Sequence, residues 1–195
     1  MIIYGASGHG KVVKSAYLGE VLFFFDDNPA IDKYNELKVF RYESVLVKNE
    51  SLVVAIGDNE IRKKVVARLN HKFGRVIAKT AEVDSTVEVG LGSQILHGAI
   101  IQVDATVGEH SIINTGASID HDCAIGSYCH IAPKVTLCGN VQVGNGTLIG
   151  AGAVVLPGVK IGENCIVGAG SVVIEDIRSN TVAVGNPART IKINE

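Results

Sequence analysis

The residues best suited to chemistry in this chain are a histidine and the two carboxylates that flank it. His121 stands between Asp120 and Asp122. A carboxylate hydrogen-bonded to an imidazole fixes the tautomer of the ring and raises its basicity, which is how proteins build a general base. Such a base contributes ~10²–10⁴-fold to a reaction rate. The triplet therefore indicates either proton-transfer chemistry or a surface histidine in a polar corner, and these residues alone leave both open.

A second group of candidate residues lies near the N-terminus, each directly after a short apolar run. In chain order these residues are Ser7, Gly8, His9, Asp26, Asp27 and Gly57. Glycines let a backbone approach a phosphate, and a helix N-terminus attracts anions. An acidic residue about 20 positions after such a loop meets a ribose hydroxyl in dinucleotide-binding folds. The loop reads G-x-x-G-x-G, whereas dinucleotide-binding loops read G-x-G-x-x-G. The pattern by itself is therefore compatible both with a nucleotide site and with a tight turn that binds no ligand.

The elements around these loops predict a small α/β domain over residues 1–78, with a Rossmann-like parallel sheet. Apolar runs at 2–4, 21–25 and 52–56 are expected as buried strands, and residues 10–18 as a helix. Ligands bind at the carboxyl ends of strands in such sheets, which is where the polar candidates stand.

A second helix is expected after Asn59, with Asp58 or Asn59 as its cap. Its apolar and charged residues are expected on opposite faces. The face toward the core would hold Ile61, Val65, Val66 and Leu69, and the solvent face Arg62, Lys63, Lys64 and Arg68.

The rest of the chain, residues 79–195, is predicted as a second domain with a C-terminal tail, and within it residues 83–173 follow a six-residue period. Every sixth position from Val83 to Val173 is Val, Ile or Leu, and the residue two places earlier is small or β-branched. This hexapeptide repeat is the signature of a parallel β-helix, in which stacked coils of about 18 residues share one core. We expect the β-helix to end near residue 178. Glycines that follow the apolar residue, such as Gly108, are expected to supply the positive φ angles of the corners.

Composition excludes several functional classes. The net charge of −2 gives no basic face, so nucleic acid is not an expected partner. No apolar run approaches the ~20 residues that span a membrane, and the start of the chain does not resemble a signal peptide, so we expect a cytoplasmic protein without membrane insertion. Cys123, Cys129 and Cys165 fall on the small-residue stripe and Cys138 at a corner, which favours packing over disulfides or metal binding.

Several motifs together resemble the sugar-nucleotide amine N-acetyltransferases of the hexapeptide acyltransferase superfamily. They are N-T-G-A-S-I-D-H-D at 114–122, V-L-P-G-V at 155–159, G-N-P-A-R at 185–189, Y-G-A-S-G-H-G at 4–10, F-D-D at 25–27 and A-I-G-D-N at 55–59. The likeness covers essentially the whole chain and is strongest to enzymes that acetylate UDP-linked bacillosamine precursors. It implies a left-handed β-helix, acetyl-CoA as co-substrate, no metal, and a homotrimer with active sites between subunits.

The resemblance also implies roles for individual residues. His121 matches the catalytic base and Asp122 the acid that raises its basicity, where the bacillosamine enzyme carries glutamate. The positions implied to hold the nucleotide sugar are Ser7, Gly8, His9, Asp26, Asp27, Gly57 and Asn114. The positions implied to line the acetyl-CoA site are His130, Gly139, Ala151, Ala169 and Arg189.

The function implied is acetylation of the 4-amino group of a UDP-linked 4-amino-4,6-dideoxy sugar by direct attack on the thioester. A GDP- or dTDP-linked amino sugar, such as GDP-perosamine, would use the same machinery. A non-catalytic nucleotide-binding scaffold is a further alternative, against which the D-H-D triplet argues. A zinc hydratase built on this prism is a last alternative. The class of hydratase that it would resemble carries two histidines five residues apart, and His110, His121 and His130 do not have this spacing.

Overall fold

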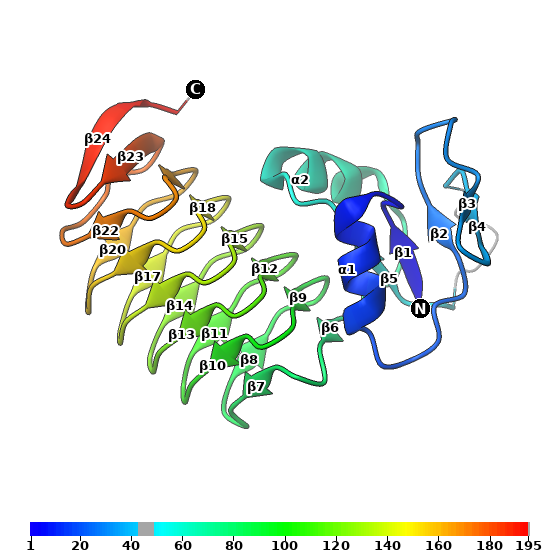
Figure 1. Ribbon diagram of the computed structural model, residues 1–195, viewed down its shortest axis with the longest axis horizontal. Helices are drawn as coiled ribbons and strands as arrows, with labels where there is room; N and C mark the ends of the chain where they lie inside the picture. The colour runs from blue at the N-terminus through cyan, green and yellow to red at the C-terminus, as the bar shows by residue number, and fades with distance from the viewer. Residues whose placement is uncertain (43–48, 195) are drawn as a thin grey trace.

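A computed structural model of the chain describes residues 1–42 and 49–194. A small α/β unit comes first and a long prism of stacked coils follows (Figure 1). The α/β unit is a five-stranded sheet of order β3-β4-β2-β1-β5 with two helices. Its elements are β1 (Ile2–Tyr4), α1 (Gly8–Ala16), β2 (Phe24–Phe25), β3 (Lys33–Tyr34), β4 (Leu37–Phe40), β5 (Leu52–Val54) and α2 (Asn59–Arg68).

Strand β1 has a neighbour on each side, because it pairs in parallel with β2 on one side and β5 on the other. The chain therefore changes sides of β1 between β2 and β5, and ligands bind at such a switch point in open α/β sheets. The three predicted strands exist, but two are shorter than expected. β2 covers only Phe24–Phe25 and β5 only Leu52–Val54, since only these residues pair with β1. The hairpin β3–β4 lies where no element was predicted.

Helix α1 begins at Gly8, two residues earlier than predicted, so its first turn is built from the glycine loop itself. Gly10 explains how this turn can lie against the end of β1. A Cβ atom on Gly10 would stand 1.9 Å from the Gly5 carbonyl oxygen, so no larger residue fits there. Neither helix of the described residues is long and apolar enough to cross a membrane.

Helix α2 corrects the predicted division of its faces. Arg62, expected on the solvent face, is 0% exposed, whereas Ile61, expected in the core, is 52% exposed. The buried stripe runs through residues 62, 65, 66 and 69, which follow the i, i+3, i+4, i+7 spacing of one helical face. The predicted cap is confirmed, since the Asp58 side chain accepts a hydrogen bond from the Ile61 N–H at 2.8 Å.

The second part is a left-handed parallel β-helix with three faces, as predicted. Face A holds β6 (Val76–Ile77), β9 (Gln94–Ile95), β12 (Ile112–Ile113), β15 (His130–Ile131), β18 (Leu148–Ile149), β21 (Ile166–Val167), β23 (Thr181–Gly185) and β24 (Ala188–Ile193). Face B holds β7 (Glu82–Val83), β10 (Ile100–Ile101), β13 (Ser118–Ile119), β16 (Thr136–Leu137), β19 (Val154–Val155) and β22 (Val172–Val173). Face C holds β8 (Glu88–Val89), β11 (Thr106–Val107), β14 (Ala124–Ile125), β17 (Gln142–Val143) and β20 (Lys160–Ile161).

Each strand of the prism pairs with the strand one coil later, so that Ile101 lies beside Ile119 and Ile119 beside Leu137. The second residue of each such strand points inward, and these aliphatic side chains form the core. Burying one of them fully stabilises the fold by ~1.5–3 kcal/mol. Cys123, Cys129 and Cys165 are buried free thiols, which confirms their predicted packing role. The antiparallel pair β23–β24 lies at the far end of the prism (Figure 1).

The corners of the prism also differ from the prediction. Positive φ angles fall on residues such as His110 and Tyr128, and Gly108, which was expected to supply one, does not have a positive φ. Gly108 is instead required by the close approach of successive coils. A Cβ atom there would lie 2.5 Å from backbone atoms of Gly126 and Ser127. We call the corners AB, BC and CA after the faces that they join.

We predict that Gly108→Ala lowers the free energy of unfolding by about 1–3 kcal/mol, because the added methyl group forces two coils apart. Urea denaturation would measure this. Thr106→Ala, on the solvent side of the preceding strand, should change stability by less than about 0.5 kcal/mol. Equal stability of the two variants would contradict this account of the corner.

Candidate active site

The carboxyl ends of β1 and β5 present an open edge of the α/β unit, which we call the nucleotide edge. Ser7 and Gly8 are exposed there at the N-terminus of α1. The Ser7 side chain makes no capping hydrogen bond, and a Cβ atom on Gly8 would meet no atom within 4 Å. Free N–H groups and the positive end of the helix dipole suit an anion such as a phosphate.

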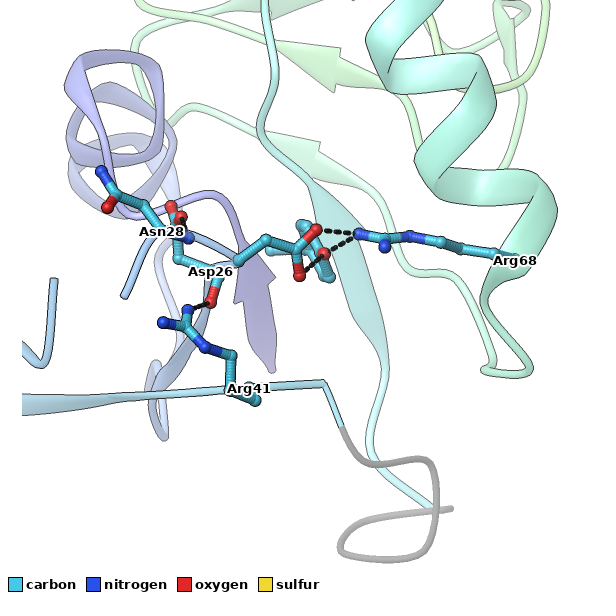
Figure 2. A network of polar contacts seen from close by, with 6 residues as sticks. Asp26, Asn28, Arg41 and Arg68 are labelled. Atoms are coloured by element: carbon cyan, nitrogen blue, oxygen red, sulfur yellow. Dashed lines mark hydrogen bonds and ion pairs between the residues drawn. The ribbon is translucent and has the colours of Figure 1, made fainter. Parts of the chain in front are cut away.

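Asp26 fixes the shape of this edge. Its carboxylate accepts hydrogen bonds from the Ala6 N–H at 2.7 Å and from the Asn28 N–H at 2.8 Å, so it ties the glycine loop to the end of β2. The guanidinium of Arg41 donates to the Asp26 carbonyl oxygen, as Figure 2 shows. The Asp26 carboxylate therefore holds the backbone of the nucleotide edge in place by accepting hydrogen bonds from its N–H groups.

Asp27 belongs to a different cluster on the side of α2. The Tyr4 hydroxyl donates to its carboxylate at 2.6 Å, and Arg68 reaches across from α2 to the same carboxylate (Figure 2). Burial alone would raise the pKa of Asp27, but the hydrogen bonds from Tyr4 and Arg68 hold this pKa below its usual value. Arg68 was predicted only as a solvent-face residue, and its pairing with Asp27 was missed.

His9 links the nucleotide edge to the prism. Its Nε2 lies 2.8 Å from Oε1 of Gln94, and the Gln94 amide nitrogen donates to the Val54 carbonyl oxygen at 2.9 Å. Because the amide nitrogen is thereby engaged, Oε1 must accept, so His9 carries its proton on Nε2. Burial lowers the pKa of His9, which favours the neutral ring. Gln94 is fully buried although polar, and no sequence signal had singled it out.

His130 joins two other predicted residues. Its Nδ1 lies 2.9 Å from the Gly57 carbonyl oxygen and its Nε2 lies 3.0 Å from the Asn114 amide nitrogen. The Thr115 N–H donates to Oδ1 of Asn114 at 2.7 Å, which fixes the orientation of that amide. His130 therefore donates from Nδ1 and accepts at Nε2. Burial lowers its pKa to about 4, so the ring is neutral at neutral pH.

His121 and Asp122 form a separate group at the BC corner. His121 Nδ1 lies 2.7 Å from an oxygen of Asp122, so the ring donates to the carboxylate and leaves Nε2 as the basic atom. The hydrogen bond to Asp122, followed by the charge of Asp120, raises the pKa of His121. A Cβ atom on Gly139 would stand 2.6 Å from His121 Nε2, so the glycine one coil later leaves room for the imidazole.

The remaining predicted residues lie at the AB corner and on strand β24. Ala151 and Ala169 stack at the AB corner, where the Gly170 N–H donates to the Ala151 carbonyl oxygen at 2.8 Å. Arg189 belongs to β24 of face A, opposite Val184, and its side chain pairs at 3.0 Å with Glu175, which follows β22 of face B. Both side chains of this pair are more than half exposed, so it contributes only ~0–1 kcal/mol.

Within one chain, Asn114 at the nucleotide edge stands apart from the His121–Asp122 pair at the BC corner. Asn114 precedes strand β13 and His121 follows it, so they occupy opposite ends of one side of the prism. A side of roughly five residues at ~3.3 Å each is on the order of 15 Å long, beyond hydrogen-bond reach. Asn114 and the basic histidine of one chain therefore do not contact each other directly. Over residues 1–42 and 49–194, no three His, Cys, Asp or Glu side chains gather as ligands for a metal ion.

Comparison with known families matches both parts of the chain. Residues 1–69 match the PglD N-terminal domain, and residues 104–139 and 140–175 match the bacterial transferase hexapeptide repeats. A perosamine N-acetyltransferase from Caulobacter crescentus, solved with CoA and GDP-perosamine, is 35% identical over 98% of this chain and 96% of its own, with a TM-score of 0.92.

Two further solved structures are similar to this chain over almost its whole length. The acetyltransferase domain of PglB from Neisseria gonorrhoeae, solved with acetyl coenzyme A, is 30% identical over 97% of this chain and 98% of its own, with a TM-score of 0.88. WeeI from Acinetobacter baumannii is 28% identical over the same shares, also with a TM-score of 0.88. Fold and sequence thus define a hexapeptide-repeat acyltransferase. Within that class, the chain belongs to the sugar-nucleotide N-acetyltransferases that carry a PglD N-terminal domain.

We predict that Asp122→Asn lowers the pKa of His121 toward its usual value of 6.5, since the carboxylate is the main cause of the raised pKa. Titration of the His121 Cε1–H signal by NMR would measure this shift. Asp32→Asn, which removes the same charge from the α/β unit, should leave the signal unchanged. An unchanged His121 pKa in Asp122→Asn would contradict the role assigned to Asp122.

Proposed function

We propose that this protein transfers the acetyl group of acetyl-CoA to the amino group of a nucleotide-linked 4-amino-4,6-dideoxy sugar. The observation that carries the proposal is the His121–Asp122 pair, with a 2.7 Å hydrogen bond and a free Nε2, on the fold of a sugar N-acetyltransferase. The CoA and acetyl-CoA complexes of the relatives support the acyl donor.

His121 is proposed as the general base of the reaction. An amine attacks a thioester only in its neutral form, so a proton must leave the nitrogen as the new C–N bond forms. Nε2 of His121 takes this proton, and Asp122 stabilises the imidazolium that results. The C–S bond then breaks and the thiolate of CoA leaves with the bonding electron pair. No covalent acyl-enzyme is required, which agrees with the buried Cys123, Cys129 and Cys165.

The nucleotide edge is proposed to hold the acceptor. The N-terminus of α1 at Ser7 and Gly8 suits the diphosphate, while His9, Asp26, Asp27 and Gly57 are candidates for contacts to the ribose, base and sugar. Asn114 lies beside this edge through its hydrogen bond with His130. The corner backbone at Ala151 and Ala169 is the proposed track for the coenzyme, with Gly139 contributed from the BC corner and Arg189 from β24.

We further propose a homotrimer in which His121 serves the nucleotide edge of a neighbouring subunit. The surface of face B supports this arrangement. Ile100 on this face is 39% exposed, and Val103, Leu156 and Ile174 beside the BC corner are 42%, 38% and 45% exposed. Face C instead exposes polar residues such as Gln142 and Lys160. A row of exposed apolar side chains along face B and its BC corner supports a contact between copies of the chain at this edge of the prism.

Two nucleotides are candidates for the acceptor. The motif resemblance supports a UDP-linked sugar of the bacillosamine type. The 35% identity to an enzyme solved with GDP-perosamine supports a GDP-linked 4-amino sugar. Both sugars carry a 4-amino group as the reacting amine, so the proposed chemistry is common to them, and the contacts to the base and to the rest of the sugar differ.

We predict rapid release of free CoA from acetyl-CoA with one member of a panel of UDP-, GDP- and dTDP-linked 4-amino-4,6-dideoxy sugars, measured by thiol detection. With that acceptor, His121→Ala should lower kcat by ~10²–10⁴-fold. Its affinity for acetyl-CoA, measured by calorimetry, should change little, because the base acts on the amine. Near-normal turnover of His121→Ala would refute the mechanism, and no release with any amino sugar would refute the proposed acceptor.

A further inference from the structure

Arg62 is a fully buried cation whose hydrogen-bond partners are all neutral oxygens. Its Nε donates to the His110 carbonyl at 2.8 Å. One terminal nitrogen donates to the carbonyls of Ile56 at 2.8 Å and Gly57 at 3.2 Å. The other donates to Asn59 Oδ1 at 2.7 Å and to the carbonyls of Tyr128 and Cys129 at 3.0 and 3.1 Å. A buried charge is costly unless it is hydrogen-bonded, and here every N–H of the guanidinium has an acceptor.

The acceptors on the prism form a regular column at the CA corner. His110, Tyr128 and Gly146 follow one another at the coil period and have positive φ angles of 54°, 58° and 71°. Arg62 binds the carbonyls of the first two, and the Asn59 amide nitrogen donates to the Gly146 carbonyl at 2.9 Å. One turn of α2 thus binds three successive coils of the prism.

The same guanidinium also holds the end of strand β5. Its hydrogen bonds to Ile56 and Gly57 fix the turn that presents the Gly57 carbonyl oxygen. That oxygen is the acceptor for His130 Nδ1, and His130 follows directly on Tyr128 and Cys129, whose carbonyls Arg62 also binds. Both partners of the His130–Gly57 hydrogen bond are therefore held by one side chain.

We propose that Arg62 is a positioning residue for acetyl transfer, which acts by holding the Gly57 carbonyl against His130 so that the His130 ring keeps one orientation and one tautomer. The proposal rests on the proposed function in so far as His130 lines the acetyl-CoA site. Lysine could not replace Arg62, because an ammonium has three donors and no planar fork to reach acceptors on both units. Burial lowers the pKa of Arg62 only to about 10, so the side chain stays charged at neutral pH.

The test compares Arg62→Met and Arg62→Lys with Lys63→Met, which removes a cation from the solvent face of the same helix. The ring-nitrogen chemical shifts of His130, measured by ¹H–¹⁵N NMR, report the tautomer. We expect Nδ1–H in the wild-type protein and in Lys63→Met, and a mixture with Nε2–H in both Arg62 variants. We also expect kcat/KM to fall by about 10²-fold in the Arg62 variants, the size of effect that a misplacement of ~1 Å produces.

A folded Arg62→Met or Arg62→Lys protein with the wild-type His130 tautomer and wild-type kcat/KM would overturn the proposal. Failure of both Arg62 variants to fold would also overturn it, since Arg62 would then be a stability residue. Thermal unfolding of each variant separates these outcomes. If the wild-type protein were inactive with every amino sugar, the proposed function would fail, while the tautomer measurement would still test the role of Arg62.

Discussion

The constraint on which this structure depends is the repeat of one coil every 18 residues, seen in the pairing of Ile101 with Ile119. Because each side chain stands above the one a coil earlier, the repeat decides which residues share a corner. It sets Gly139 beside His121, where the missing side chain leaves space for the ring. It also aligns the corner carbonyls of His110 and Tyr128, which a single arginine can then bind.

The α/β unit is joined to the prism by both apolar and polar contacts. Leu96 and Ile112 of the prism are fully buried against the core that contains Ile3 and Val53. The polar contacts, from His9 to Gln94 and from His130 to Gly57, lie at the nucleotide edge. Apolar burial supplies most of the free energy of such an interface, whereas hydrogen bonds with fixed donors and acceptors determine its geometry. The polar contacts therefore give the candidate site its shape.

Much of this architecture could be predicted from the sequence, because the hexapeptide period and the parallel strands are local patterns. The pairing of His121 with Asp122 was also predictable, since the two residues are neighbours in the chain. The burial of Arg62 was not predicted, because charge was taken to mean exposure. Its position on the stripe shared with Val65 and Val66 was the available signal. Contacts such as His9 with Gln94 depend on how the two units meet, and no local pattern encodes that.

The central claim is that the base of one subunit acts at the nucleotide edge of another. Mixing two inactive variants tests it directly, with His121→Ala lacking the base and Asn114→Arg obstructing the edge. If the site is shared, refolding an equal mixture should restore about a quarter of wild-type acetyl transfer, because some interfaces combine an intact base with an intact edge. Restoration to that level would support the account. A mixture as inactive as either variant alone would contradict it, since the site would then lie within a single chain.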